Sequence, residues 1–240
     1  MAQKKSRLFP VAFLAAKATL AALKLTNHEG GTLPGFIAEG IDPAFLGDIA
    51  KPEQIVFITG TNGKTTTNNL LNDLLADNGY RTVTNRVGGN ISSGFASSFA
   101  KNATWKGTSK TKLAVMEFDE LSGPRIFPYL QPDILSVTNL FRDTFSRSAT
   151  PDYVFDVMDK GIPASTHLIL NADDMISCRL APQCTHRTYY SIARLAEDTA
   201  EPVGIVSDLT ACPKCGGKLK WDYAHLRHLG HATCEECGYT

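Results

Sequence analysis

The 240-residue sequence has no excess of charge of either sign: 24 Lys and Arg residues balance 24 Asp and Glu residues, and the formal net charge is zero. A neutral chain offers no overall electrostatic attraction to nucleic acid or to a strongly charged partner surface. A charged ligand must therefore be bound by a local group of residues. The sequence also lacks internal repeats and low-complexity segments, and its 43% hydrophobic content is enough for a globular core.

The N-terminal region has no hydrophobic run long enough to cross a membrane. Residues 8–16 follow three basic residues and superficially resemble a signal peptide, but Lys17 and Lys24 interrupt the apolar stretch. We expect an amphipathic helix that docks on its own domain. The alternative is a basic, apolar helix that lies on a membrane surface.

The sequence that follows alternates between apolar strands and helical patterns. Predicted strands cover residues 55–59, 112–118, 133–138 and 167–171, and predicted helices cover residues 65–77, 122–130, 152–160 and 173–180. This order is typical of an α/β domain with a mostly parallel sheet that is covered on both faces. Ligands of such domains bind at the carboxyl ends of the strands.

Composition divides the chain into three parts. We expect residues 1–52 to hold the first helix and a connector rich in turn residues, residues 53–205 to form the α/β domain, and residues 206–240 to form a separate cysteine-containing unit.

Four of the six cysteines form two CxxC pairs, at residues 212–215 and 234–237. Four thiolates close a tetrahedral zinc site that has no open position, so this pattern predicts a structural zinc ribbon. The expected zinc ligands are Cys212, Cys215, Cys234 and Cys237. Three histidines between the pairs could substitute as ligands, but we expect them to be surface residues: His225, His228 and His231. Cys178 and Cys184 have no partner pattern and are interpreted as half-buried structural thiols in a reducing compartment.

A glycine-rich sequence, GTNGKTTT at residues 60–67, lies between the first predicted strand of the α/β domain and the helix that follows. Backbone N–H groups and the helix dipole attract phosphate at such a turn, the lysine reaches terminal phosphates, and the next hydroxyl binds Mg²⁺. The general P-loop pattern has another glycine where this chain has Ile58, so this is the shortened GxxGKT form. The expected phosphate-binding residues are Gly60, Thr61, Asn62, Gly63, Lys64, Thr65 and Thr66. The alternative is a glycine-rich turn that contains a lysine by chance.

A P-loop needs an acidic group that holds Mg²⁺ against the phosphates. The predicted strand at residues 112–118 runs into Glu117, Asp119 and Glu120. We expect Glu117 to be the magnesium ligand together with Thr65, and the other two acids are possible substitutes. The alternative is that these acids only end a strand in solvent.

The end of the next predicted strand carries a second pair of polar residues. Asn139 and Asp143 are four residues apart, so in a helical turn they would share one face toward the nucleotide crevice. Alone, this pair is weak evidence.

Together these motifs resemble the central ATPase domain of the Mur ligase family. The matching pieces are GTNGKTTT, a strand ending in Glu117, VTN at 137–139 with Asp143 beyond it, LNADD at 170–174, LPG at 33–35 and the Gly-Gly-Asn turn at 88–90. A four-cysteine ribbon is not typical of the members that add amino acids. It is similar to the MurT branch of the family, the synthetase subunit of lipid II isoglutaminyl synthase, and this resemblance covers nearly all of the chain.

The resemblance implies a cytoplasmic, ATP-dependent carbon-nitrogen ligase of peptidoglycan biosynthesis that uses ATP, Mg²⁺ and Zn²⁺. ATP would phosphorylate the D-glutamate α-carboxyl of the lipid II stem peptide at the inner membrane surface. Ammonia from a GatD-like glutaminase partner would then displace phosphate from the acyl phosphate and give D-isoglutamine. Lys64, Glu117 and Asp143 would be the catalytic residues, and Asn139 would contact the nucleotide.

Two features depart from the family pattern. Asp143 is followed by Thr144 where amino-acid-adding members have histidine, which favours the MurT branch and leaves the role of Asp143 open. The family also has a C-terminal domain that completes the ATP site, and more of the central domain normally follows the ribbon. We therefore expect this chain to be truncated within the central domain, and whether it is active alone stays open.

Two other functions stay open from the sequence. One is another Mur-type ligase or a folylpolyglutamate-synthase-like enzyme, which the ribbon disfavours. The other is a non-catalytic nucleotide- or nucleic-acid-binding module that uses the ribbon as its contact surface. Zero net charge and the few basic and aromatic residues in the ribbon disfavour that module, so no nucleic-acid partner is expected.

Overall fold

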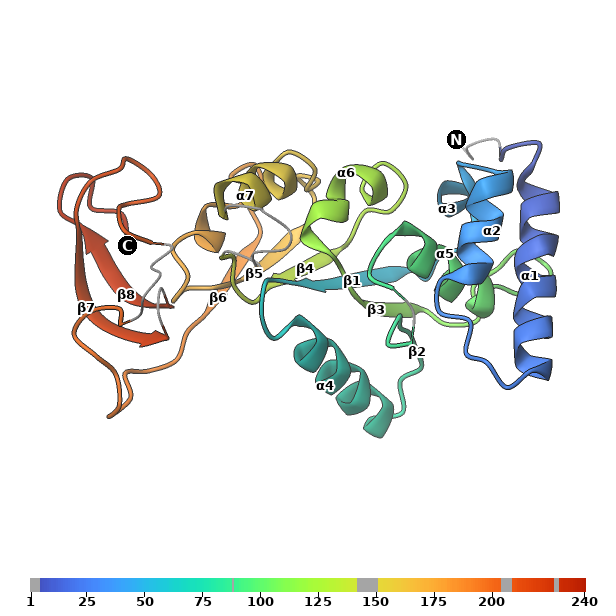
Figure 1. Cartoon of the computed structure of the whole chain (residues 1–240), viewed down its shortest axis with the longest axis horizontal. Helices are drawn as coiled ribbons and strands as arrows, with labels where there is room; N and C mark the ends of the chain where they lie inside the picture. Colours follow the sequence, from blue (N-terminus) through green and yellow to red (C-terminus); the bar gives the residue numbers. More distant parts are fainter. Residues whose placement is uncertain (1–4, 88, 142–150, 204–208, 227–228) are drawn as a thin grey trace.

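The computed structural model describes residues 5–87, 89–141, 151–203, 209–226 and 229–240. The molecule is elongated (Figure 1). Three N-terminal helices form one end, a six-stranded sheet with its helices forms the centre, and a two-stranded hairpin forms the other end. No helix within the described ranges is long and apolar enough to cross a membrane.

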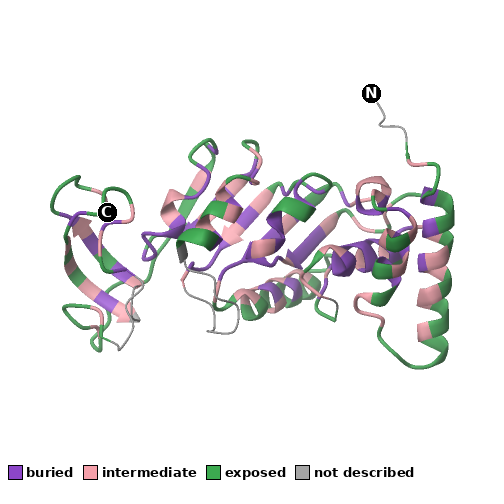
Figure 2. Cartoon of the chain, turned by 45° about the horizontal axis from the view of Figure 1, so that its top comes forward, coloured by how far each residue is buried: buried purple, intermediate pink, exposed green. Residues whose placement is uncertain are grey.

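The central sheet has the strand order β2-β3-β1-β4-β5-β6, and its described strand pairs are all parallel. The strands are β1 (Gln54–Thr59), β2 (Thr82–Val83), β3 (Leu113–Glu117), β4 (Ile134–Val137), β5 (His167–Asn171) and β6 (Arg187–Tyr190). The predicted α/β architecture with a mostly parallel sheet is confirmed, and β1, β3, β4 and β5 coincide with the predicted strands. Burial is concentrated along these strands, as Figure 2 shows.

Helices lie on both sides of the sheet. α4 (Lys64–Asp77) lies on one side, and α6 (Gly123–Ile126) and α7 (Pro151–Asp159) lie on the other (Figure 1). α4 and α7 match predicted helices. Two predicted helices are wrong in extent: residues 122–130 contain only the short α6 after a 3₁₀ turn, and residues 173–180 contain only a 3₁₀ turn.

Local chemistry explains both differences. α6 ends two residues before Pro128, which has no backbone N–H to continue the helical hydrogen-bond pattern. In the second segment, the buried Asp174 carboxylate accepts the backbone N–H groups of Leu140 and Ile176 at 2.6 and 3.0 Å. A side chain that binds nearby backbone groups competes with the helical hydrogen-bond pattern.

The sequence patterns did not predict β2, β6 or α5 (Ser92–Asn102). α5 is rich in serine and contains glycine, which have lower helix propensity than alanine or leucine. Tertiary packing stabilises it instead, because Phe95 and Phe99 are fully buried. Phe95 makes an edge contact with Phe57 of β1, with ring centroids 5.1 Å apart.

The first helix, α1 (Phe9–Leu25), docks on its own domain, as expected. Phe9, Ala12 and Ala16 are buried, and the Phe9 ring stacks on Phe45 with centroids 5.6 Å apart. The segment expected to be a connector contains two more helices, α2 (Leu33–Ile41) and α3 (Phe45–Asp48).

The C-terminal hairpin consists of β7 (Leu219–Leu226) and β8 (Leu229–Cys234), which pair antiparallel. Two hydrogen bonds tie it to the segment after β5. The Gly230 N–H donates to the Asp173 carbonyl at 2.8 Å, and the Tyr239 hydroxyl donates to the Met175 carbonyl at 2.9 Å. Ala232 belongs to the main hydrophobic core, so the hairpin packs on the α/β domain.

α2 and α5 approach each other closely at Gly35. A Cβ atom at this position would lie 2.0 Å from the Ser93 carbonyl oxygen and 2.8 Å from the Ser97 nitrogen. The Gly35 N–H also donates to the Ser97 hydroxyl at 2.7 Å. Only glycine fits this crossing without moving one of the helices.

We expect Gly35→Ala to destabilise the protein by about 1–3 kcal/mol, because the added methyl group forces α2 away from α5. Gly40→Ala is the matched control, since it lies in the same helix and its Cβ would meet nothing within 4 Å. The control should be neutral or up to about 1 kcal/mol stabilising. Chemical denaturation of both variants tests this; equal stabilities would contradict the close crossing.

Candidate nucleotide-binding site

The glycine-rich loop joins the end of β1 to the start of α4. Gly60 and Gly63 have φ angles of 130° and 81°, in the region that favours glycine. A Cβ on Gly60 would lie 2.0 Å from the Thr138 hydroxyl oxygen. α4 begins at Lys64, directly after Gly63, so its first N–H groups have no intrahelical acceptor. Together with the helix dipole, they form a site that attracts an anion.

The end of β4 braces this loop. Asn139 accepts the Asn62 backbone N–H and donates to the Asn62 carbonyl, both at 3.1 Å, and Thr138 donates to the same carbonyl at 2.6 Å. The sequence predicts that the Asn139 side chain faces the nucleotide. In the structure this side chain lies beside the loop, and its amide group bonds to the loop backbone. Asp143 and the rest of residues 142–150 lie outside the described residues.

Thr65 and Glu117 meet across the carboxyl ends of β1 and β3. The Thr65 hydroxyl donates to one Glu117 carboxylate oxygen at 2.7 Å, and the Asn90 amide donates to the other at 3.0 Å. Asn85 bonds both the N–H and the carbonyl of Glu117, each at 2.8 Å. A hydroxyl and a carboxylate in contact are the two protein oxygens that a P-loop offers to Mg²⁺, so the residues fit this ion.

Lys64 folds back over the loop. Its ammonium group donates to the Gly60 carbonyl at 3.0 Å and lies 3.4 Å from a Glu120 carboxylate oxygen. The same Glu120 oxygen accepts the Gly60 N–H at 2.9 Å. Sequence reasoning treated Glu120 as a substitute metal ligand. In the structure it contacts Lys64, while the carboxylate of Asp119 accepts the Ser122 hydroxyl at 2.9 Å.

Sequence reasoning gave no role to Asn85, Asn90 or Asp174. Asn90 ends the Gly-Gly-Asn turn, and no sequence pattern marks Asn85. Asp174 is fully buried and holds the backbone of Leu140. Burial raises the pKa of the Asp174 carboxyl to about 6, although its hydrogen bonds to backbone N–H groups oppose that shift.

The four expected zinc ligands form one cluster, with their sulfur atoms all within 4.8 Å of one another. Backbone N–H groups point at the sulfurs: Lys214 donates to Cys212, Gly217 to Cys215 and Cys237 to Cys234, at 3.4 to 3.5 Å. Four thiols at this spacing fit a tetrahedral Zn²⁺ ion and leave no protein position open.

The other two thiols and the two described histidines of the hairpin lie outside this cluster. Cys178 is partly buried, as expected, whereas Cys184 is fully buried, and each thiol donates to a backbone carbonyl. Burial raises the pKa of Cys178 to about 12. His231 is on the surface beside Asp222, but the His225 side chain is only 8% exposed and lies 2.7 Å from Asp198. His228 is outside the described residues.

Comparison with curated proteins places this geometry in a family. The Mur ligase middle domain matches residues 58–208. The chain is 36% identical over 230 residues to the lipid II isoglutaminyl synthase (glutamine-hydrolyzing) subunit MurT of Staphylococcus aureus strain COL, covering 93% of this chain and 50% of that protein. The same subunit of Streptococcus pneumoniae is 34% identical over 214 residues, covering 88% and 46%. The chain therefore spans about half the length of these curated relatives.

Solved structures agree on the fold. A crystal structure of MurF from Acinetobacter baumannii superposes with a TM-score of 0.50 at 17% identity, covering 69% of this chain and 38% of that chain. At this identity the likeness concerns the fold alone. Since the middle-domain match covers well over half of the residues, this chain belongs to the Mur ligase family.

Proposed function

We propose that this chain provides the ATP site of an enzyme that amidates the D-glutamate α-carboxyl of lipid II. The reaction would pass through an acyl phosphate and give D-isoglutamine, with ammonia supplied by a glutaminase partner. The names of the relatives support this substrate and the use of glutamine. The contact between Thr65 and Glu117 at the mouth of the loop is the observation that carries the ATP site.

The described residues suit phosphoryl transfer to a carboxylate. The loop amides and Lys64 would bind the phosphates, and Lys64 would neutralise charge on the transferred γ-phosphoryl group. Thr65 and Glu117 would hold Mg²⁺, which supplies further neutralisation when bound. A substrate carboxylate oxygen attacks the γ-phosphorus and ADP leaves; ammonia then attacks the acyl carbon, and phosphate leaves. Asp143 is proposed as a further catalytic residue from the family pattern.

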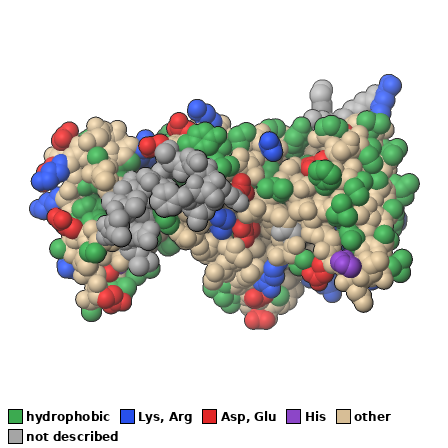
Figure 3. Space-filling model, in the orientation of Figure 1, with side chains coloured by type: hydrophobic (Ala, Val, Ile, Leu, Met, Phe, Trp, Pro, Cys, Tyr) green, Lys and Arg blue, Asp and Glu red, His purple; other side chains and the backbone are tan. Residues whose placement is uncertain are grey.

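We place the enzyme in the cytoplasm, at the inner face of the membrane where lipid II is accessible. Figure 3 shows hydrophobic side chains gathered at the end of the molecule formed by the N-terminal helices. Val11, Leu14 and Leu25 of α1 are more than half exposed. These side chains support a peripheral membrane contact, since apolar residues on one side of a basic helix favour the lipid interface.

The reaction itself is tested with lipid II that carries D-glutamate, ATP and ammonium ions, with and without a glutaminase subunit and glutamine. We expect ADP release coupled to a carboxyl-to-amide mass change in the stem peptide. Turnover with a UDP-linked precursor and a free amino acid, but not with lipid II, would instead identify an amino-acid-adding ligase.

Lys64→Ala should weaken ATP binding by about 10- to 100-fold, because it removes a charge-assisted bond to phosphate. Its metal content should stay unchanged. Cys212→Ser should do the reverse: it should release zinc and loosen the hairpin while ATP affinity stays within about twofold. Calorimetric ATP titration and elemental analysis measure both properties. Loss of both in either variant would contradict the separation of the two sites.

Glu117→Gln should weaken ATP binding by at least about tenfold in the presence of Mg²⁺ and change it little in excess chelator, because it removes a carboxylate ligand. Asp119→Asn is the matched control, since it neutralises the neighbouring acid that contacts Ser122. A larger effect of the control than of Glu117→Gln would move the magnesium site to Asp119.

A further inference from the structure

A buried ion pair lies beside the nucleotide loop. The side chains of Lys64 and Glu120 are only 20% and 10% exposed, and the Lys64 ammonium group lies 3.4 Å from one Glu120 carboxylate oxygen. By contrast, the side chains of Lys112 and Glu53 form a pair on the surface of the molecule. Water replaces the partners of a surface pair when they separate, whereas a buried carboxylate that loses its cation keeps an uncompensated charge.

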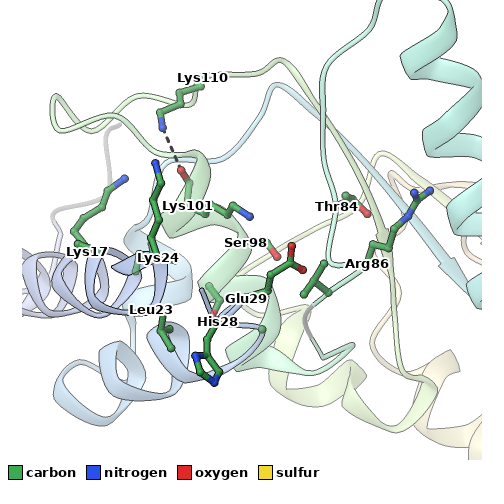
Figure 4. A pocket seen from close by; sticks show the side chains of 16 residues that line it. Lys17, Leu23, Lys24, His28, Glu29, Thr84, Arg86, Ser98, Lys101 and Lys110 are labelled. Atoms are coloured by element: carbon green, nitrogen blue, oxygen red, sulfur yellow. Dashed lines mark hydrogen bonds between the residues drawn. The ribbon is translucent and has the colours of Figure 1, made fainter. Parts of the chain in front are cut away.

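Lysines elsewhere in the molecule bind neutral groups instead. Figure 4 shows a pocket of about 600 Å³ between α1, α5 and the segment after β2, and several lysines line it. There Lys110 donates to the Lys101 carbonyl at 3.2 Å. A carbonyl that loses such a donor stays uncharged, but the Glu120 carboxylate does not. Movement of Lys64 therefore has an electrostatic cost that movement of Lys110 does not have.

Glu120 is held in place independently of Lys64. The carboxylate oxygen that faces Lys64 also accepts the Gly60 N–H at 2.9 Å, which ties Glu120 to the start of the loop. The second oxygen makes no hydrogen bond with any residue that the structure describes. The contact with Lys64 is the weaker one, because charge-assisted hydrogen bonds are about 2.7–2.9 Å long. Lys64 can therefore move away while the carboxylate stays in place.

Bound ATP would draw Lys64 away from Glu120. In the proposed site this lysine binds the phosphates, which would lie at the first N–H groups of α4. The buried Glu120 carboxylate would then have no cation and would lie close to a triphosphate of the same sign. Both effects raise the free energy of the complex. A small cation in the place of the Lys64 ammonium group removes both.

We propose that Glu120 binds an ammonium ion at the place that Lys64 leaves when ATP is bound. The Lys64 side chain itself ends in an ammonium group, so this place already suits the charge and the N–H donors of the ion. Its acceptors are the Glu120 carboxylate and the Gly60 carbonyl, which accepts from Lys64 at 3.0 Å. The inference rests on the proposed function, since ammonium is the conjugate acid of the nucleophile that the amidation consumes. It adds that ATP and ammonium bind cooperatively, because each favours the state in which Lys64 has left Glu120.

The test measures binding of the non-hydrolysable analogue AMP-PNP with Mg²⁺ by calorimetry, in ammonium chloride or tetramethylammonium chloride at equal ionic strength. Tetramethylammonium has the same charge, but it is larger and has no N–H group. We expect the analogue to bind at least about fivefold more tightly in ammonium. Glu120→Gln removes the buried negative charge and keeps an acceptor for Gly60. This variant should bind the analogue at least as tightly as the unmodified chain in tetramethylammonium, and its ammonium effect should fall below about twofold.

Asp73→Asn is the matched control, because it removes an exposed acid of α4 that pairs with Arg86 instead of Lys64. It should keep the full ammonium effect. Persistence of that effect in Glu120→Gln at an unchanged melting temperature would overturn the proposal, and so would an equal effect of sodium chloride. Analogue binding without any ammonium effect would overturn the ammonium site alone. Absence of analogue binding in every salt would refute the proposed nucleotide site, and the ammonium site with it.

Discussion

The parallel pairing of β1 with β3 on one side and β4 on the other is the constraint on which the site depends. Its register sets Ile58 opposite Glu117 and Thr59 opposite Val137. The loop that leaves β1 at Gly60 therefore has the acid of β3 on one flank and the polar residues after β4 on the other. A one-residue slip of β3 would turn the Glu117 side chain to the opposite face of the sheet.

The loop keeps its shape through residues that are not part of its motif. Its two ends bind different neighbours: Gly60 donates to Glu120, and Asn62 exchanges hydrogen bonds with Asn139. A glycine-rich segment has many accessible conformations, and fixing each residue costs about 1–2 kcal/mol of backbone entropy. Hydrogen bonds to residues that follow β3 and β4 offset that cost. They leave the first N–H groups of α4 directed at one place.

The sequence predicted the parts of this site that depend on local patterns. Strand, loop and helix follow one another directly, so GTNGKTTT and the acid at 117 could be recognised without a structure. The partner of Lys64 could not, because three acids lie within four residues and only the turn after β3 decides that Glu120, rather than Asp119, faces the loop. α5 was missed for a similar reason: its serines and glycine argue against a helix, and only the packing of Phe95 and Phe99 explains it.

The cysteine cluster could be predicted almost completely, since CxxC spacing alone brings two sulfurs together and one hairpin unites the pairs. What the spacing could not predict is where the hairpin attaches. It bonds Asp173 and Met175, and the residue between them, Asp174, holds the backbone of Leu140 after β4. The hairpin and the strand end beside the nucleotide loop are thus fastened to the same three residues.

Zero net charge conceals an uneven distribution of charge. Acidic side chains gather at the end of β3, where Lys64 contacts Glu120, and lysines gather between α1 and α5. Like charges held together raise the free energy of the fold unless an opposite charge is bound, and the effect is strongest where water is partly excluded. A carboxylate-binding metal relieves the first group, and an anionic ligand relieves the second.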